Sequence, residues 1–469
     1  MSVNSGTIDR PLRVAIVGSG PSGFYAAGAL QQADLNVQID MLDRLPAPFG
    51  LVRYGVAPDH DNIKVITRLF EKIAQKENFS FLGNVYVGKD ISVEELKEFY
   101  DAIIFACGAE TDRKLDIPGI DLEGSHTATE FVGWYNGHPD YVDREFDLSQ
   151  EVVVIIGQGN VAIDVARILC KTVDELNKTD ISQHALDILA ESKIKEVHMV
   201  GRRGPVQSAF TFAEIEEIQD LKNCTPVFDK KYLDINEASR IELNNPNDHM
   251  YIRKWKVFEN FAQTKDIKKR KLILDFYLSP VEIKGQGRAE KVIFEENELV
   301  GKPKAQKATG TGRFIEIDCG LFFRSVGYQG RPLGWVPFDE QKGIFPNKDG
   351  RILDGDHEVP GMYAVGWIGQ GPVGVIGTNK SPAQKTVANL LADIPRLTPC
   401  RNSNPQAIYD FLKQKGVAVI TFDDWKKIDA AEIARGQEAG KPREKFIRVE
   451  DMMNVVGKKT LMSTDEKRR

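Results

Sequence analysis

The feature that most constrains the fold is a glycine-rich turn between an apolar run and an expected helix near the start of the chain. The run Val14–Val17 precedes Gly18, Gly20 and Gly23, which gives the spacing G-x-G-x-x-G. In such a strand–turn–helix unit the first glycine permits a tight turn, the second lets a pyrophosphate approach the backbone, and the third lets the helix pack closely on the strand. The helix N-terminus also offers free N–H groups to phosphate. The pattern predicts a dinucleotide-binding unit.

A second apolar strand supports this interpretation. It runs over 37–42 and ends in Asp43, which lies about 20 residues beyond Gly23, where a ribose-binding carboxylate is expected. The glycines alone would fit a tight turn without a ligand equally well. The flanking strand, the helix and the acid together favour a nucleotide site.

The glycine pattern occurs a second time. Strand 152–156 is followed by G-x-G-x-x-A, which starts at Gly157 and ends at Ala162. The next strand runs into Arg202 and Arg203 rather than into an acid. An acid at this place favours a free ribose 2′-hydroxyl, whereas arginine favours a 2′-phosphate through bidentate charged hydrogen bonds. The first unit is therefore expected to bind FAD or NAD and the second NADP; the alternative for the arginines is a solvated turn.

Composition limits the remaining classes. The 469 residues suggest two to three domains, and the net charge of −6 argues against a general nucleic-acid binder. No apolar run is long enough to span a membrane. The first dozen residues resemble no targeting signal, so we expect a cytosolic protein, with the mitochondrial matrix as the alternative if a presequence has been removed. The five cysteines form no C-x-x-C pair, which disfavours a disulfide reductase and predicts no metal site.

Positive charge gathers in 251–271, which has eight lysines and arginines against two acids. Two interpretations stay open, a solvated face and a docking surface for an acidic macromolecule. Elsewhere we expect a long ordered loop over 46–60, a strand near Val85–Val87, a flexible loop at 308–312 and two helical pieces near 405–415 and 428–437.

The chain closely resembles the adrenodoxin reductase type of ferredoxin–NADP reductase, a glutathione-reductase-like flavoprotein family. The resemblance covers nearly the whole chain except about 225–270. It rests on long motifs at 18–25, 48–60, 131–136, 157–167, 201–205 and 366–378, and in the tail at 431–436 and 440–444.

The resemblance implies an α/β fold with two Rossmann-like dinucleotide-binding domains, the NADP domain inserted into the FAD domain. On this basis we expect a first FAD part over 1–112, an inserted NADP domain over 113–328, and a second FAD part with a C-terminal tail over 329–469.

The resemblance also implies site residues. The expected FAD contacts are Gly18, Gly20, Ser22, Gly23, Asp43, Leu51, Val87, Trp367, Gly374, Val375 and Ile376. The expected NADP contacts are Gln158, Gly159, Asn160, Val161, Arg202, Arg203, Glu214 and Gly374. His60 and Asp164 match polar residues that the family places beside the flavin and its partner face, where we expect supporting rather than obligatory acid–base roles.

The implied activity is hydride transfer from NADPH to FAD, followed by single-electron transfer to an acidic iron–sulfur ferredoxin that docks on basic residues. The run Arg253–Lys256 is a candidate for that surface. Family members commonly have arginine where this chain has Glu216, so the docking residues cannot simply be transferred. Two alternatives are an NADPH-dependent flavin subunit or diaphorase that feeds another acceptor, and a redox-sensing FAD module without turnover.

Overall fold

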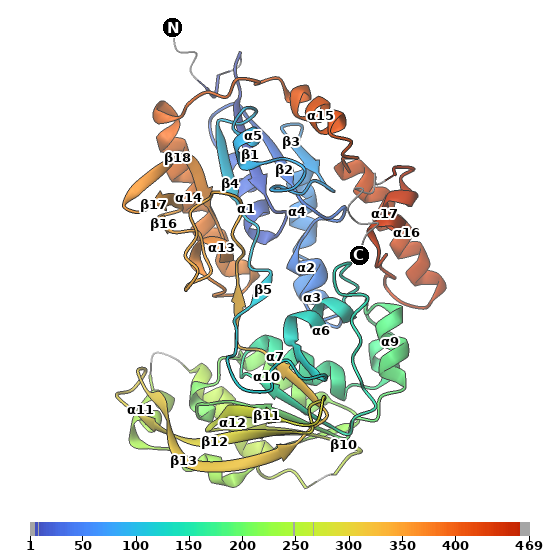
Figure 1. Ribbon diagram of the computed structural model, residues 1–469, viewed down its shortest axis with the longest axis vertical. Helices are drawn as coiled ribbons and strands as arrows, with labels where there is room; N and C mark the ends of the chain where they lie inside the picture. Colours follow the sequence, from blue (N-terminus) through green and yellow to red (C-terminus); the bar gives the residue numbers. More distant parts are fainter. Residues whose placement is uncertain (1–4, 8, 247–248, 266, 460–469) are drawn as a thin grey trace.

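The computed structural model describes residues 5–7, 9–246, 249–265 and 267–459. Figure 1 shows two lobes, one above the other, joined by extended segments. The upper lobe contains both the blue start and the orange and red end of the chain, and the lower lobe contains the cyan-to-yellow middle. We call them the first and the second lobe.

The first lobe is built on a seven-stranded sheet in the order β16-β17-β18-β4-β1-β2-β3. The five strands from β18 to β3 are parallel, and β16 and β17 add antiparallel strands at one edge. All six residues of β1 are buried, as expected for a central parallel strand with a continuous apolar run. The strands are β1 (Leu12–Val17), β2 (Val37–Leu42), β3 (Phe79–Leu82), β4 (Ala102–Phe105), β16 (Asn347–Lys348), β17 (Arg351–Asp354) and β18 (His357–Ala364).

The second lobe is built on a six-stranded parallel sheet in the order β6-β14-β7-β8-β10-β9. These strands are β6 (Ser125–Thr127), β7 (Val152–Ile156), β8 (Glu196–Val200), β9 (Cys224–Phe228), β10 (Arg270–Asp275) and β14 (Leu321–Arg324). A three-stranded antiparallel sheet packs here as well, formed by β11 (Leu278–Lys284), β12 (Lys291–Val300) and β13 (Lys307–Asp318).

A short antiparallel ladder joins the two lobes. It pairs β5 (Thr111–Asp112) with β15 (Tyr328–Gln329). The expected domain bounds at 112 and 328 fall at this ladder, and they stay a prediction.

Helices cover the sheets and the link between the lobes. In the first lobe they are α1 (Pro21–Leu30), α2 (Leu51–Tyr54), α3 (Asp61–Lys64), α4 (Thr67–Ala74), α5 (Val93–Leu96), α13 (Trp367–Gln370), α14 (Lys380–Asp393), α15 (Pro405–Gln414), α16 (Phe422–Glu438) and α17 (Val449–Val455). In the second lobe they are α6 (Ala128–Tyr135), α7 (Asn160–Cys170), α8 (Val173–Leu176), α9 (Gln183–Ala190), α10 (Phe212–Glu217), α11 (Glu237–Leu243) and α12 (Met250–Phe261).

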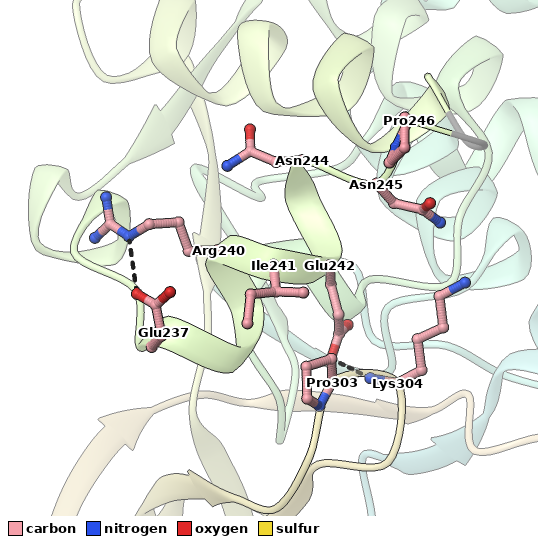
Figure 2. Close-up of a pocket in the computed structure, with 9 residues that line it drawn as sticks. All are labelled: Glu237, Arg240, Ile241, Glu242, Asn244, Asn245, Pro246, Pro303 and Lys304. Carbon is pink, nitrogen blue, oxygen red and sulfur yellow. Dashed lines mark hydrogen bonds and ion pairs between the residues drawn. The ribbon is translucent and has the colours of Figure 1, made fainter.

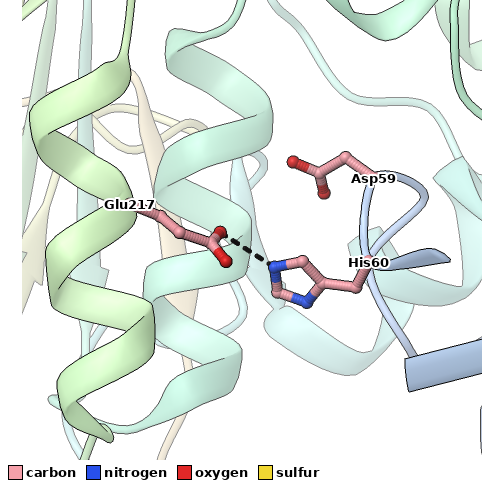
Figure 3. Close-up of side chains that lie close together, drawn as sticks. All are labelled: Asp59, His60 and Glu217. Atoms are coloured by element: carbon pink, nitrogen blue, oxygen red, sulfur yellow. Dashed lines mark hydrogen bonds and ion pairs between the residues drawn. The ribbon is translucent and has the colours of Figure 1, made fainter. Parts of the chain in front are cut away.

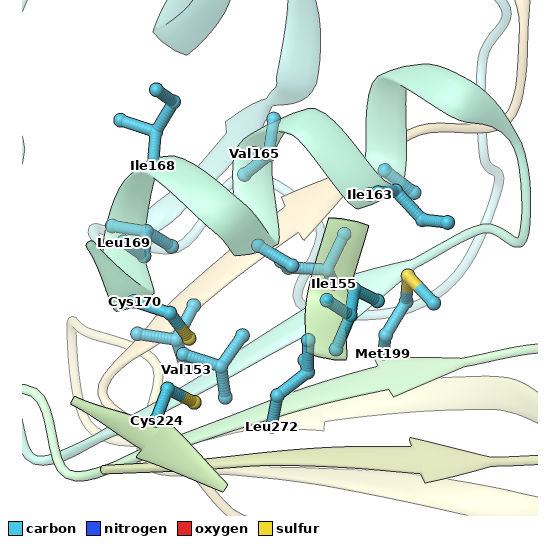
Figure 4. Close-up of a cluster of buried hydrophobic side chains, with 14 of the residues drawn as sticks. Val153, Ile155, Ile163, Val165, Ile168, Leu169, Cys170, Met199, Cys224 and Leu272 are labelled. Carbon is cyan, nitrogen blue, oxygen red and sulfur yellow. The ribbon is translucent and has the colours of Figure 1, made fainter. Parts of the chain in front are cut away.

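The core of the second lobe lies between its parallel sheet and helix α7. Figure 4 shows Ile163 and other side chains of α7 packed over Val153, Ile155 and Leu272 of the sheet. Cys170 and Cys224 point toward each other within this core, and both are fully buried. Their contact was not foreseen from the sequence, because 54 positions separate them. The side-chain hydrogen bond with Cys224, together with burial, raises the pKa of Cys170 well above its ordinary value, so its thiol is poorly reactive.

Three expectations about local structure were wrong. Val85–Val87 forms only an isolated bridge between Val87 and Ile91, and the strand lies earlier, at β3. The expected loop at 308–312 belongs to strand β13, because it pairs with β12 around a bulge. The last expected helix near 428–437 begins earlier, since Thr421 caps α16 by accepting a hydrogen bond from the backbone of Asp424.

Within the described part of the chain, no helix is long and apolar enough to cross a membrane.

Candidate functional site

The first glycine turn has the geometry of a nucleotide-binding turn. Gly18 adopts φ +105°, and a Cβ there would lie 2.5 Å from the carbonyl oxygen of Ala106. Gly23 permits close packing, since a Cβ would collide with the Gly18 carbonyl. A Cβ on Gly20 would instead have no atom within 4 Å. The space beside Gly20, at the N-terminus of α1, therefore fits a pyrophosphate held by backbone N–H groups.

Asp43 stabilises this turn from the end of β2. Its Oδ2 accepts hydrogen bonds from the backbone N–H of Ser19 at 3.0 Å and from the Ser19 hydroxyl at 2.5 Å. Its Oδ1 accepts from the backbone N–H of Leu45 at 2.9 Å. The expected ribose contact of Asp43 stays a prediction, and the structure adds a second task, which is to brace the turn.

Other expected FAD residues converge on the same turn. A Cβ on Gly366, the residue before Trp367, would collide with the Ser22 side chain, so these segments touch. Leu51 follows Gly50, whose added Cβ would lie 3.0 Å from Gly20 Cα.

The remaining expected FAD residues differ in how exposed their side chains are. Gly374 and Val375 are exposed and Ile376 is half-buried beside α1, on the turn after α13. Val87 is 4% exposed and belongs to the same buried apolar cluster as Val17 and Phe105, which leaves little of its side chain for a ligand. The Trp367 ring lies 5.3 Å from that of Tyr328 and is half-buried.

The second glycine turn repeats the arrangement. Gly159 is the N-cap of helix α7, and a Cβ there would have no atom within 4 Å. The neighbouring Gln158 anchors the turn, because its side-chain amide donates to the carbonyls of Met199 and Asp275 at 3.0 and 3.2 Å. Asn160 Oδ1 accepts from the backbone of Thr211 at 2.9 Å. Val161, next in α7, is half-buried. This turn also fits a pyrophosphate.

Arg202 and Arg203 are exposed directly after β8. Their carbonyls are fixed, since Arg202 accepts from the Asn297 side chain at 3.0 Å and Arg203 from the backbone of Tyr277 at 3.1 Å. Neither guanidinium forms an ion pair with a carboxylate of the described residues. A fixed backbone with two unpaired cations suits a 2′-phosphate.

Between the lobes lies a cluster of charged side chains that the sequence did not foresee as a whole. His60, at the end of the loop after α2, places Nε2 2.9 Å from Oε2 of Glu217 at the end of α10. Figure 3 shows this pair, with Asp59 beside it. Arg167 on α7 also reaches His60 Nε2, at 2.7 Å. A single ring nitrogen serves one partner at a time, donating to Glu217 when protonated and accepting from Arg167 when not.

Arg167 lies at the centre of this cluster. It is 1% exposed and pairs with Asp59 at 2.6 Å and Asp164 at 2.8 Å. Lys171 also binds Asp59, at 2.6 Å. The carboxylates and His60 are close enough together to hold a cation, and the Arg167 guanidinium supplies positive charge among them.

The cluster shifts the titration of its members. Burial would lower the pKa of His60, but Glu217 and Asp164 outweigh burial and raise it. Burial raises the pKa of Asp164, and Arg167 counteracts this only partly. Burial and the Asp164 charge raise the pKa of Glu214 to about 7. Glu214 is thus a proton-binding group poised near neutral pH where the two lobes meet.

The structure brings His60 and Asp164 together, with side-chain atoms within 4.8 Å of one another. Their expected place beside the flavin and its partner face stays a prediction. It places Glu214 in the same cluster, with Oε2 3.9 Å from His60 Nε2, whereas the sequence had grouped Glu214 with the arginines. Sequence reasoning missed Asp59 and Glu217 as partners. Asp59 directly precedes His60 in the motif at 48–60, so the sequence could have indicated that it lies in the same site. Nothing in the sequence around Glu217 indicated its role.

Two surface recesses lie outside this cluster. One, of about 550 Å³, is lined by residues that include Arg68 and Lys72 of α4 and Ile376. The other, of about 470 Å³, lies at α11 and the loop before β13 (Figure 2). In the second recess Glu242 accepts a hydrogen bond from the backbone of Lys304 at 2.7 Å, which ties the loop to the helix.

Comparisons with known proteins agree with this architecture. The family model for pyridine nucleotide-disulphide oxidoreductases matches residues 12–220. The NADPH-ferredoxin reductase FprA of Mycobacterium tuberculosis is 43% identical over 95% of this chain and 99% of its own length. The mitochondrial NADPH:adrenodoxin oxidoreductase of Homo sapiens is 40% identical over 96% of this chain and 93% of its own length.

A solved structure is similar throughout. Mycobacterium tuberculosis FprA in complex with NADPH superposes with a TM-score of 0.90 at 42% identity, covering 95% of this chain and 99% of that one. The similarity spans both lobes and the segments that connect them.

Proposed function

Since this chain belongs to the family of NADPH-ferredoxin and NADPH:adrenodoxin reductases, we propose that it oxidises NADPH and passes the electrons singly to an iron–sulfur ferredoxin. FAD, when bound, supplies a carrier that accepts a hydride and releases electrons one at a time. The observation that carries the proposal is the pair of open glycine turns, at Gly20 and Gly159, one in each lobe.

In this proposal the first lobe holds FAD. The N-terminus of α1 and the space beside Gly20 take the pyrophosphate. Asp43 keeps the turn rigid through its hydrogen bond with Ser19. The remainder of the FAD molecule would be bordered by Ser22, Leu51 and the turn at 374–376. Val87, whose side chain is almost fully buried, would support the FAD site by packing and not by direct side-chain contact.

The second lobe holds NADPH. The turn at Gly159 and Asn160 takes the pyrophosphate, and Arg202 with Arg203 takes the 2′-phosphate. Trp367 and Gly374 would border the nicotinamide.

His60 and Asp164 orient the two lobes rather than abstract a proton. The Arg167 guanidinium links the His60 loop to α7, and the bond of His60 to Glu217 links it to α10. Hydride transfer requires the donor and acceptor atoms to be held close together. A rigid junction at this point contributes to that geometry.

We propose two basic areas for docking the ferredoxin. On α12, Arg253 and Lys256 are exposed, but Lys254 is not: it is 8% exposed and donates to the carbonyl of Ser208 at 2.8 Å. The expected run therefore shrinks to two residues. The recess that contains Arg68 and Lys72 offers a second basic area, and it reaches Ile376, an expected flavin contact.

The docking proposal is tested by the salt dependence of ferredoxin reduction. A partner attracted by charge is reduced more slowly as salt rises. Neutralising Arg253 and Lys256, or separately Arg68 and Lys72, should flatten that dependence if the area is used. A rate that does not change with salt contradicts docking by charge. Rapid reduction of small dyes with slow reduction of ferredoxin would instead favour a diaphorase.

The cytosolic location stays a prediction, because bacterial relatives and relatives named as mitochondrial both match over nearly the whole chain.

A further inference from the structure

A short segment of the C-terminal tail touches both lobes. Residues 441–446 follow helix α16 and belong to a part of the chain for which the proposed function so far gives no task. Lys445 and Glu432, which anchor this region, have fully or almost fully buried side chains.

On the side of the second lobe the segment binds residues near the start of α9. Lys445 Nζ donates to the carbonyl of Asp180 at 3.0 Å and lies 3.2 Å from its carboxylate. Glu444 accepts from the backbone N–H of Gln183 at 3.0 Å. Lys441 completes the contact, with Nζ 2.5 Å from Glu444 and 3.2 Å from Gln183 Oε1.

On the side of the first lobe the contact runs through Glu432 of α16. Its carboxylate accepts from the backbone N–H of Phe446 and from Arg443, each at 2.9 Å. It also accepts hydrogen bonds from both terminal nitrogens of Arg53, at 2.9 and 2.5 Å. Arg53 lies in α2, two residues after Leu51.

Asp180 extends the connection to the loop that bears His60. Lys64 Nζ lies 2.5 Å from Asp180 Oδ1 and donates to the carbonyl of Pro58 at 3.4 Å. Burial would raise the pKa of Asp180, but Lys445 and Lys64 lower it, so the carboxylate stays charged. Burial lowers the pKa of Lys445 to about 7, although Asp180 counteracts this. The segment 51–64 is thus connected to the tail at both ends. Arg53 binds Glu432 directly, and Lys64 is connected to Lys445 through Asp180.

We infer that Asp180 is a positioning residue: held by Lys445, it fixes the Pro58–His60 stretch through Lys64 and so sets the distance between the FAD and NADPH sites. This inference rests on the proposed function. Small displacements of a reacting pair are costly to rate even when the displaced group lies away from the chemistry. The tail segment 441–446 then contributes to the geometry of hydride transfer as well as to folding.

The test is the substitution Lys64→Met in the FAD-loaded protein. It cuts the link to the loop while Asp180 keeps its partner Lys445, so the buried carboxylate stays paired. We expect the limiting rate at which NADPH bleaches the flavin absorbance to fall about ten-fold. The NADPH concentration for half-maximal rate should not change, because the phosphate-binding residues are untouched. Lys64→Arg should restore most of the rate.

Lys458→Met is the matched control. Lys458 pairs with Asp424 at 2.6 Å, in the same tail but without a link to the His60 loop. Its limiting rate, normalised to bound FAD, should equal that of the wild type. Thermal melting of each variant separates a loss of folding from a loss of position.

The outcomes separate the two proposals. If NADPH does not bleach the wild-type flavin, the proposed function fails. If the wild type is bleached and Lys64→Met reaches the wild-type limiting rate, the positioning role is wrong. A Lys64→Met protein that loses rate and NADPH affinity together, or that Lys64→Arg does not rescue, also overturns it.

Discussion

The imidazole of His60 and the carboxylate of Glu217 lie 2.9 Å apart, although 157 positions separate them in the sequence. His60 ends a loop of the first lobe and Glu217 ends α10 of the second, so this hydrogen bond is a direct contact between the lobes. Arg167 reaches the same ring nitrogen. Whether His60 Nε2 carries a proton therefore decides whether it donates to Glu217 of α10 or accepts from Arg167 of α7.

The first prediction concerns this pair. In Glu217→Gln the pKa of His60 should fall, because burial lowers that pKa and the hydrogen bond to Glu217 is a main influence that raises it. The measurement is an NMR titration of the His60 ring protons. Glu216→Gln is the control, since Glu216 is the exposed neighbour on the same helix. A His60 pKa that is the same in Glu217→Gln and wild type would contradict the pairing.

A second prediction concerns nucleotide choice. Replacing Arg202 and Arg203 by alanine should raise the KM for NADPH and spare that for NADH. A hydrogen bond to a charged group contributes roughly 1.5–3 kcal/mol, so each arginine should account for about a ten- to hundred-fold change. Steady-state kinetics with both nucleotides provide the check. Arg401→Ala, an exposed arginine in the first lobe, should leave both KM values unchanged. Equal losses for NADPH and NADH would make the arginines structural.

The glycines of the two turns give a third prediction. Gly159→Ala should leave the Tm unchanged, because the added Cβ meets no atom within 4 Å and the backbone is extended, yet it should weaken NADPH binding by occupying the pyrophosphate space. Gly23→Ala should lower the Tm, since its Cβ would collide with the Gly18 carbonyl. Melting curves and NADPH titrations distinguish the two. Unchanged NADPH affinity in Gly159→Ala would place the phosphates elsewhere.

The fourth prediction is a pH dependence of stability. The pKa of Glu214 is raised from 4.5 to about 7 by burial and by Asp164. Its contribution to stability is therefore fully present below about pH 4.5 and is lost as the pH rises through about 7. Without nucleotide, Glu214→Gln should melt higher than wild type at pH 8 and at nearly the same temperature at pH 4.5. A higher Tm for wild type at pH 8 would mean that the ionised carboxylate is favourable there.

Local patterns were sufficient to predict the two strand–turn–helix units with their glycine turns. A continuous apolar strand, the glycine spacing and the following helix are all encoded within about thirty neighbouring residues. The parallel sheets then follow from the same units. The ladder of β5 with β15 had no such signal, because its strands are two residues long and lie far apart in the sequence.

Tertiary contacts account for what the sequence did not predict. The stretch 308–312 contains two glycines, which are typical of a loop, but cross-strand pairing with β12 makes it a strand. Lys254 was grouped with the basic surface by its charge alone. Its helical spacing to Val257, Phe258 and Phe261, all buried, placed it on the inner face and could have shown this. The hydrogen bond between His60 and Glu217 could not be predicted, because it depends on how the two lobes pack against each other.

The most direct measurement of the central claim is an anaerobic titration of the purified protein with NADPH, followed by addition of oxidised ferredoxin. The proposed function predicts a flavin absorbance band that NADPH bleaches and that returns on adding ferredoxin, with one flavin serving two ferredoxin molecules. Bleaching without recovery would contradict ferredoxin as the acceptor. A protein with no flavin band, or with a band that NADPH leaves unchanged, would contradict the assignment of the two glycine turns.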